Sequence, residues 1–347
     1  MAITITTRSS FIKQFHAQEG NSKIVCFKFW ELVSAAGCPY SCSYCFLQAT
    51  PSYVFKHYPL HGAIFSNWKQ MLEEVDIWLK HPIPRMLVIG ELQDGLAFDS
   101  IYKKQFGIAL TEMLIPKFAK QNRHQLLFLS KSIYIKNVLN LQPTNQVIFS
   151  WSVNAEDAAK RWEKGAPSPY KRFDAAKKIK EKGWRIRFRL DPMIPYEGWQ
   201  EGYLWTIKQI NDLEPEMVTI GSLRASNTLG SHAKKNGRDA SIFDLLTEKD
   251  PSGFKNRLPL AIHSKLFAFA LKHLKSSTKP ALCKEDLSLW KSLGLAFNGC
   301  HCLLDSNDGL IIPRQYLVDQ LSEKTLIATM QSGRYLHRLH IKQRRQP

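Results

Sequence analysis

The chain has 347 residues, of which 44% are hydrophobic and 22% charged, a composition typical of a globular protein with one large domain and an appendage or with two modest domains. The N-terminal segment has no apolar signal core and no run of 18 apolar residues occurs, so we expect a cytoplasmic protein with no membrane partner. Seven cysteines, an odd number, argue against a disulfide framework, and the formal net charge of +18 favours polyanionic partners.

The positive charge is concentrated between residues 160 and 189. This segment holds twelve lysines and arginines against three acids, a local excess of nine that makes up half of the net charge. A basic run by itself usually means a solvated helix face that serves only solubility. Because the excess extends over the whole chain, the sequence favours nucleic-acid binding.

Short β-type runs alternate with amphipathic helical stretches between about residue 25 and residue 230. The expected strands are residues 23–34, 85–90, 125–130, 146–153, 185–192 and 216–223. The expected helices between them include residues 67–80, 103–120, 171–182 and 199–213. This alternation is the pattern of βα units and a parallel sheet. Six such units are too few to close an ordinary eight-stranded barrel.

We expect three parts along the chain. Residues 1–24 would form an N-terminal extension, and residues 25–230 would form the α/β domain. Residues 231–347 would form a smaller, basic and mainly helical C-terminal appendage, with a polar stretch up to residue 256 and helices at 258–274 and 284–293.

Three cysteines, Cys38, Cys42 and Cys45, lie in one loop that follows the first expected strand. Three thiolates can hold three irons of a 4Fe–4S cluster and leave the fourth iron open, and an open position is the mark of a catalytic metal site. A zinc site would need a fourth cysteine or histidine at ligand spacing, which His57 and His61 do not provide. The spacing Cys-x-x-x-Cys-x-x-Cys is the signature of radical S-adenosylmethionine (SAM) enzymes, in which the open iron binds SAM and the reduced cluster cleaves it.

Around these cysteines the chain resembles the spore photoproduct lyase-like family of radical SAM proteins. The segment from Cys38 to Thr50 contains the pattern Cys-Pro-x-x-Cys-x-Tyr-Cys-x-Leu-Gln-x-Thr, and similar islands occur at 152–154, 165–172 and 192–203. The likeness covers most of residues 25–300, densely only in these islands. It implies the open, six-unit βα barrel of the radical SAM type and the repair of a thymine dimer lesion in DNA.

The resemblance also implies contacts with SAM. Lys131 would pair with the SAM carboxylate, Glu91 would hold the amino group, and Ser152 and Asn154 would supply further polar contacts. A zwitterionic methionine end needs one cation and one acceptor near the open iron. Tyr44 corresponds to a tyrosine that is implied in radical relay.

One departure from the family pattern concerns the hydrogen donor. In the dimer-repairing lyases a cysteine shortly after the second strand returns a hydrogen atom to the product radical. The matching stretch here, residues 88–94, contains no cysteine, and Glu91 stands about where it is expected. A carboxylate O–H bond is too strong to donate hydrogen to a carbon radical. Cys300 and Cys302 are therefore candidate donors, with Cys283 upstream; buried small hydrophobes and a metal or redox trio are the alternatives.

We therefore expect a radical SAM lyase with a 4Fe–4S cluster that acts on a pyrimidine lesion in DNA, of the spore photoproduct type. Its electrons would come from a flavodoxin- or ferredoxin-type donor. Lys171, Arg172 and Arg257 are the expected nucleic-acid contacts. The alternatives are a radical SAM enzyme that acts on RNA, a peptide or a small molecule, and a nucleic-acid-binding protein with a structural or redox cluster.

Overall fold

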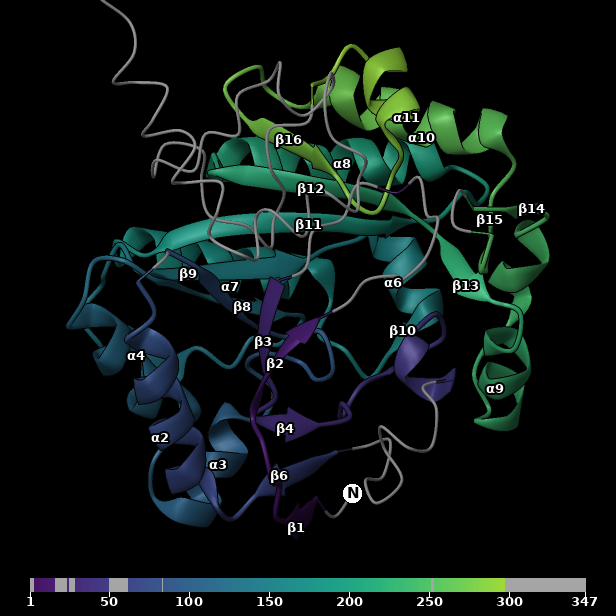
Figure 1. Ribbon diagram of the computed structural model, residues 1–347. Helices are drawn as coiled ribbons and strands as arrows, with labels where there is room; N and C mark the ends of the chain where they lie inside the picture. The colour runs from purple at the N-terminus through teal and green to yellow at the C-terminus, as the bar shows by residue number, and fades with distance from the viewer. Residues whose placement is uncertain are drawn as a thin grey trace, which may run out of the picture.

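The computed structural model describes residues 3–15, 24, 29–49, 62–82, 84–250 and 253–296. Its centre is an eight-stranded sheet with the strand order β16-β12-β11-β9-β8-β7-β3-β2 (Figure 1). The strands are β2 (Ile12–Phe15), β3 (Phe29–Leu32), β7 (Met86–Ile89), β8 (Gln125–Ser130), β9 (Val147–Ser152), β11 (Arg185–Met193), β12 (Met217–Ser222) and β16 (Lys279–Leu282). All neighbours pair in parallel except β2, which is antiparallel to β3. Among the described strands, no pairing between β2 and β16 closes the sheet into a barrel.

All six strands that the sequence predicts are present in this sheet, and the open, partial barrel is confirmed. Strands β8, β9 and β12 are buried at every residue. Such continuous burial is expected where helices cover a parallel sheet, and it explains why these strands are apolar runs rather than alternating ones. The prediction missed β16, a further parallel strand from the segment beyond residue 230.

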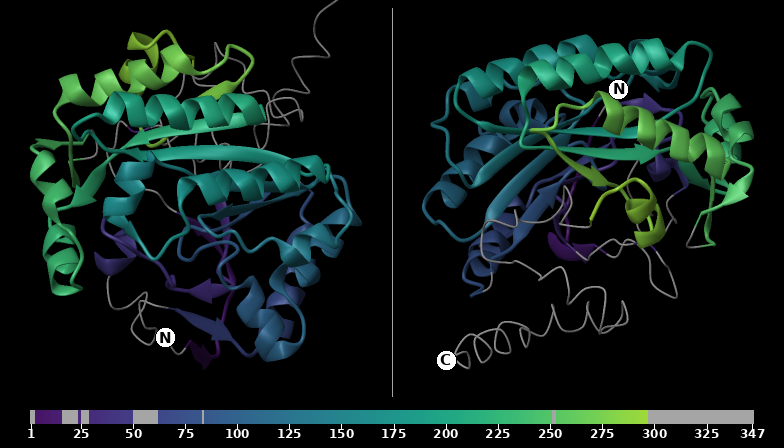
Figure 2. Two further views of the ribbon diagram at one scale, coloured as in Figure 1. Left: turned by 180° about the vertical axis from the view of Figure 1, so that it is seen from behind. Right: turned by 90° about the horizontal axis from the view of Figure 1, so that it is seen from above.

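Helices and turns connect these strands, and Figure 2 shows several of the helices lying along the outer face of the central sheet. Their bounds are α2 (Trp68–Leu79), α3 (Asp99–Phe106), α4 (Leu110–Ala119), α5 (Lys136–Leu139), α6 (Glu156–Trp162), α7 (Pro169–Glu181), α8 (Trp199–Leu213), α9 (Leu229–Lys235), α10 (Leu260–His273) and α11 (Leu287–Ser292), with 3₁₀ turns η1 (Phe46–Ala49) and η2 (Ser241–Leu245). The single helix expected at 103–120 is two helices, because Gly107 at φ 76° ends α3 in the left-handed conformation. No helix of the described residues is long and apolar enough to span a membrane.

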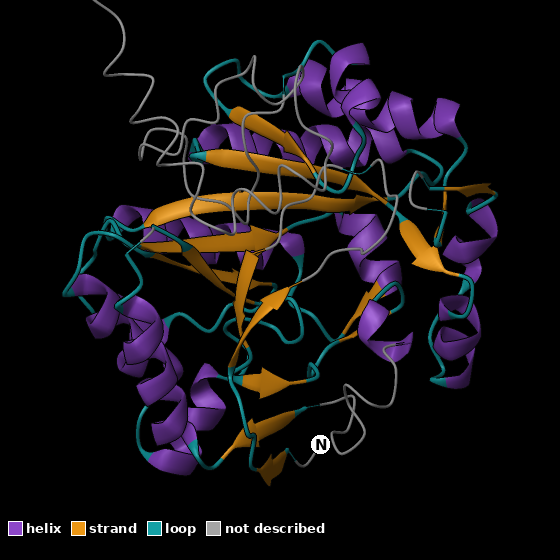
Figure 3. Ribbon diagram, in the orientation of Figure 1, coloured by secondary structure: helices purple, strands orange, loops and turns teal. Residues whose placement is uncertain are grey.

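Shorter strands form three small sheets around the central one (Figure 3). Their members are β1 (Thr4–Thr6), β6 (Ala63–Phe65) and β4 (Ala35–Ala36); β5 (Ser41–Cys42) and β10 (Glu163–Lys164); and β13 (Arg224–Ser226), β15 (Lys255–Arg257) and β14 (Glu248–Lys249). The first 24 residues and the segment after residue 230 each contribute a strand, β2 and β16, to the central sheet. The expected part boundaries therefore do not coincide with the ends of the sheet.

Candidate active site

A cavity of about 220 Å³ lies where the parallel strands end. Its wall includes the three loop cysteines and residues that close or follow β7, β8, β9, β11, β12 and β16. In βα folds the carboxyl ends of the strands are where catalytic side chains gather, since each strand delivers a different loop to the same place. The cavity therefore joins residues that are far apart in the sequence.

The cysteine loop is fixed by hydrogen bonds to its backbone. Cys42 lies in β5, which pairs with β10, and the Ser43 amide donates to the carbonyl of Trp162 at 2.8 Å. The Gln48 side-chain amide donates to the carbonyls of Ser43 and Cys45 at 2.8 and 3.2 Å. These bonds give Gln48 a structural role, because its side chain ties two backbone carbonyls of the cysteine loop together.

Cys42 is buried and Cys38 and Cys45 are half-buried, and the surrounding protein raises the pKa of Cys38 well above its usual range and the pKa of Cys42 to about 12. Burial raises the pKa of Cys45 as well. Iron requires thiolates, so binding would release three protons and its positive charge would stabilise the anions. In the described parts of the chain, no three His, Cys, Asp or Glu side chains converge as ligands of one metal ion. Sulfurs that bind separate irons of a cluster need not converge, so the donor set fits a 4Fe–4S cluster.

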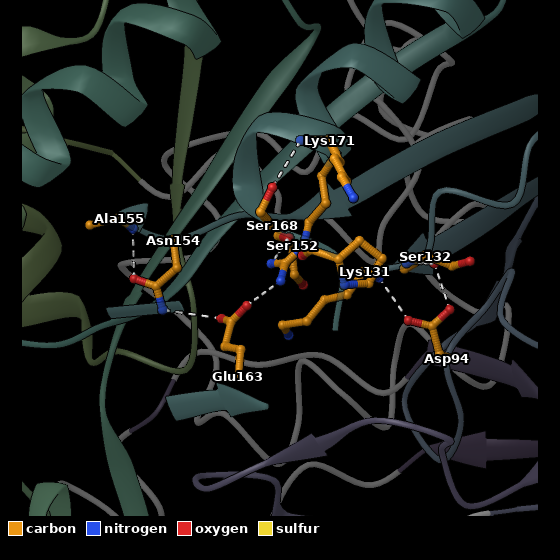
Figure 4. A network of polar contacts seen from close by, with 12 residues as sticks. Asp94, Lys131, Ser132, Ser152, Asn154, Ala155, Glu163, Ser168 and Lys171 are labelled. Atoms are coloured by element: carbon orange, nitrogen blue, oxygen red, sulfur yellow. Dashed lines mark hydrogen bonds and ion pairs between the residues drawn. The ribbon is translucent and has the colours of Figure 1, made fainter. Parts of the chain in front are cut away.

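A buried carboxylate, Glu163, is hydrogen-bonded to Tyr44 of the cysteine loop. The Tyr44 hydroxyl and the Asn154 amide nitrogen donate to one carboxylate oxygen of Glu163, the latter at 3.2 Å, and the Arg172 guanidinium donates to the other. Figure 4 shows the contact between Asn154 and Glu163. Burial acts to raise the pKa of Glu163, but Arg172, Lys131 and these hydrogen bonds outweigh it and hold the pKa at about 2. Glu163 therefore stays ionised and fixes the Tyr44 hydroxyl.

This network corrects two sequence expectations. Arg172 has no exposed surface, and its guanidinium also donates to the carbonyls of Pro167 and Ser152 at 2.8 and 3.0 Å. The prediction that Arg172 contacts nucleic acid is therefore wrong, because a buried guanidinium cannot reach a phosphate. Asn154 is also fully buried, and its amide oxygen accepts from Tyr203 at 2.7 Å. Asn154 holds Glu163 instead of lining the cavity.

Three of the four residues expected to contact SAM line the cavity, namely Glu91, Lys131 and Ser152. Asp94, which the sequence reasoning missed, fixes the segment that carries Lys131: its carboxylate accepts from the Ser130 hydroxyl at 2.5 Å and from the Lys131 amide at 2.7 Å. Figure 4 shows the Lys131 side chain running from Asp94 toward Glu163. The Lys131 ammonium lies 5.6 Å from the centre of the Tyr44 ring.

Gly90 explains how the turn after β7 comes so close to β8. Its φ is +138°, and a Cβ atom there would collide with the carbonyl oxygen of Leu129. Only glycine avoids both the backbone strain and this collision. The sequence signal for this turn is the glycine directly after an apolar strand, followed within four residues by Asp94.

The cavity wall also carries positive side chains that the sequence reasoning did not assign to the site. Lys131 is joined by Arg189, Arg224, Lys255 and Lys284, five cations against the three carboxylates Glu91, Asp94 and Asp191. Burial, with Lys284 and Arg224 nearby, lowers the pKa of Lys255 to about 8. The lowered pKa reflects burial first and the neighbouring cations second, and an anionic ligand would oppose both effects.

The basic run from residue 160 to residue 189 does not form one solvated face. Arg187 is fully buried and pairs with Glu216, which also pairs with Arg185. Lys171 is exposed on α7, and Arg257 on β15 is mostly covered, with its guanidinium 3.8 Å from Glu248. The candidate donors Cys300 and Cys302 lie outside the described residues.

Solved structures share this fold. A spore photoproduct lyase in complex with dinucleoside spore photoproduct is 15% identical, covers 81% of this chain and 82% of its own, and superposes with a TM-score of 0.64. A mutant spore photoproduct lyase with bound AdoMet and dinucleoside spore photoproduct is 16% identical, covers 80% and 81%, and gives a TM-score of 0.62. At these identities the likeness establishes the fold.

Curated relatives match in sequence. The spore photoproduct lyase of Bacillus subtilis is 26% identical over 184 residues, which are 53% of this chain and 51% of the relative. That of Clostridium acetobutylicum is 24% identical over 190 residues, which are 53% of this chain and 52% of the relative. The chain thus spans about half the length of the curated relatives it matches. The sequence model described as spore photoproduct lyase matches residues 29–222, more than half of the chain, and the chain belongs to the spore photoproduct lyase family.

Proposed function

We propose that this chain is a radical SAM lyase that repairs a pyrimidine lesion of the spore photoproduct type in DNA. The observation that carries the proposal is the composition of one cavity wall: three cysteines at radical SAM spacing lie in the same cavity as five cationic side chains. A metal centre with an open iron explains the first group, and a phosphodiester explains the second. The names of the relatives and of their bound dinucleoside support the same substrate class.

The proposed cofactors are a 4Fe–4S cluster on Cys38, Cys42 and Cys45, and SAM beside Glu91, Lys131 and Ser152. When bound, they supply a 5′-deoxyadenosyl radical that abstracts hydrogen from a carbon of the base and lets the cross-link fragment. The Arg189 guanidinium lies 3.8 Å from the Glu91 carboxylate, whose oxygens can accept a hydrogen bond from an ammonium group.

Tyr44 would act as the radical relay. Burial, Glu163 and Cys42 raise the pKa of its phenol well above the usual range, so the hydroxyl keeps its proton. Because Glu163 is ionised, its carboxylate accepts the hydrogen bond from the Tyr44 hydroxyl. It would receive the hydroxyl proton if an electron left the Tyr44 ring.

DNA would be the partner, with RNA as the alternative, and a flavodoxin- or ferredoxin-type protein would supply the electrons. A lesion must leave the base stack to enter the cavity, and distorted bases are the cheapest to extrude. Lys171 and Arg257 would contribute to phosphate contacts, which hold the strand without selecting sequence and weaken with salt.

The test is anaerobic reconstitution of the cluster, reduction with dithionite, and addition of SAM with ultraviolet-irradiated spore-type DNA. We expect 5′-deoxyadenosine and repaired thymidine residues in the strand, both measured by mass spectrometry after digestion of the DNA to nucleosides, and no 5′-deoxyadenosine that depends on DNA when the DNA is unirradiated. A reduced, SAM-bound cluster that forms no 5′-deoxyadenosine would point to a structural or redox cluster. 5′-Deoxyadenosine without repair would move the search to RNA, peptide or small-molecule substrates.

Lys255 provides a pH test of the cationic wall. Its ammonium is charged below about pH 8 and loses the proton above it, so affinity for a phosphodiester should fall as the pH rises from 7 to 9. The thymidine dinucleotide TpT, titrated by calorimetry, should bind about tenfold more weakly at pH 9, the size of one charge-assisted hydrogen bond. Lys255→Arg, which stays charged, should remove this pH dependence. An unchanged pH dependence in Lys255→Arg would exclude Lys255 as its source.

A further inference from the structure

A fourth thiol shares the cavity with the three loop cysteines. Cys283 lies directly after β16, and its amide donates to the carbonyl of Ile220 at 2.8 Å, which extends the pairing of β16 with β12. The side chain is buried and forms part of the cavity wall. Because β16 comes from the segment expected to be an appendage, the sequence alone did not place this thiol at the site.

Burial keeps the Cys283 thiol in its protonated form, and the Asp191 carboxylate acts in the same direction. The Arg189 guanidinium donates to the sulfur at 2.8 Å and to the Asp191 carboxylate at 2.9 Å. The pKa of Asp191 is lowered because Arg189 and Arg224 outweigh the effect of burial, so this carboxylate is ionised and can only accept. The negative charge of Asp191 beside the sulfur disfavours the thiolate, although Arg189 favours it. Burial likewise raises the pKa of the thiol to about 11, so the S–H bond is intact at neutral pH.

The backbone around Cys283 is fixed as firmly as its side chain. The Arg224 guanidinium donates to the carbonyl of Cys283, and it donates to the carbonyl of Lys284 at 2.6 Å and to the Glu285 carboxylate at 3.3 Å. Lys284 has φ 57°, in the left-handed region that a lysine rarely adopts. Such a conformation persists only where the surroundings impose it, and here it turns the chain at the cavity wall.

We propose that Cys283 is the hydrogen-atom donor to the substrate radical in this cavity. The proposal rests on the radical chemistry proposed above. Once the cross-link has broken, one carbon of the product carries an unpaired electron. The S–H bond of Cys283 breaks, its hydrogen atom forms a C–H bond at that carbon, and a thiyl radical remains on sulfur. The thiyl returns to the thiol by taking one electron from the ferredoxin- or flavodoxin-type donor and one proton from water.

The cationic side chains beside Cys283 are placed to support this hydrogen-atom transfer. Arg189 approaches both Cys283 and Glu91, at 2.8 and 3.8 Å, so it joins the thiol to the end of β7. Arg224 and Lys255 are charged neighbours of the same thiol and would hold the phosphodiester beside it. The substrate carbon that receives hydrogen would thus lie between the cluster loop and Cys283.

The experiment compares Cys283→Ala, Cys283→Ser and a Cys300→Ala/Cys302→Ala double variant, each reconstituted, with lesion-containing dinucleotide in deuterated water. Thiols exchange with solvent, so the wild-type product should carry one deuterium at the carbon where the cross-link broke. We expect both Cys283 variants to form at least tenfold less repaired product while still forming 5′-deoxyadenosine, and the double variant to match the wild type. Serine keeps the size of the side chain, but its O–H bond is too strong to donate hydrogen.

A second measurement does not depend on turnover. In the reconstituted, unreduced protein, saturating dinucleotide should slow alkylation of Cys283 by iodoacetamide, mapped by mass spectrometry, at least fivefold and leave Cys300 and Cys302 unaffected. Full labelled repair by Cys283→Ser, or alkylation of Cys283 that the dinucleotide does not slow, would overturn the assignment. If the wild type itself forms no 5′-deoxyadenosine, the proposed function fails, whereas the alkylation result still reports whether Cys283 lies in the binding cavity.

Discussion

Replacing Cys42 with alanine is expected to remove most of the bound iron and to lower SAM cleavage at least about a hundredfold, more than the loss of a residue that only supports a metal ligand. Cys42 is buried in the strand pair β5–β10 and lines the cavity, so no solvent ligand can easily replace its sulfur. Iron analysis and the visible absorption of the anaerobically reconstituted protein measure the first effect, and 5′-deoxyadenosine formation measures the second.

The matched control for this prediction is Cys283→Ala, which removes a different buried thiol of the same cavity. This variant should keep the full iron content, since Cys283 is engaged with Arg189 and Asp191. A Cys42→Ala protein that retained all its iron would show that the loop does not hold the cluster. Loss of iron in Cys283→Ala would make that residue a ligand.

Arg172→Met is expected to destabilise the fold by about 3–5 kcal/mol, the usual cost of leaving one member of a buried ion pair alone. Both side chains are almost wholly buried, and Arg172 joins Glu163 to the carbonyl of Ser152 at the end of β9. Thermal unfolding should shift by roughly 10 °C. Lys171→Ala, the exposed neighbour on the same helix, should change stability by less than about 0.5 kcal/mol.

The stability difference between Arg172→Met and the wild type should change with pH in a direction that the pKa of Glu163 determines. In the wild type the pKa of Glu163 is held at about 2, below its usual 4.5, so its contribution to stability is present above pH 4.5 and is lost as the pH falls toward 2. Without Arg172, burial would raise the pKa of Glu163, and protonation would then favour the folded state. The gap between variant and wild type should narrow from pH 7 to pH 5, and Arg172→Met/Glu163→Gln should recover most of the loss. An unchanged gap would mean that Glu163 stays ionised without its arginine.

Much of the fold follows from local sequence pattern. The apolar runs that became β8, β9 and β12 are covered on both faces, so their hydrophobicity alone predicts them. Strand β16 carries Lys279 and Pro280, and among the described strands it pairs with β12 alone. Its sequence therefore resembles a loop, and its place depends on tertiary pairing. Gly107 is enough to predict the break between α3 and α4, but the prediction of a single helix did not take this glycine into account.

The residues of the site also fall into those that local sequence predicts and those that only the tertiary structure brings together. The cluster cysteines are close in sequence, and their spacing predicts them. Arg172 and Glu163 are nine residues apart, and a charged residue on an amphipathic helix gives no sign in sequence that it turns inward. Cys283 lies 94 residues from Arg189, and their contact exists only because β16 and β11 flank the same strand, β12. Long-range contacts of this kind have no local signal.

The cavity wall has two origins in the chain. The segment that matches the family model, residues 29–222, carries the cluster loop, Lys131 and Arg189, whereas Arg224, Lys255 and Cys283 lie beyond its end. A protein built this way can change what it accepts by altering the later segment and leave its metal-binding half untouched. The same arrangement means that a fragment ending at Ser222 would keep all three cluster thiols yet expose β12 as a bare edge strand, inviting self-association through unpaired backbone groups.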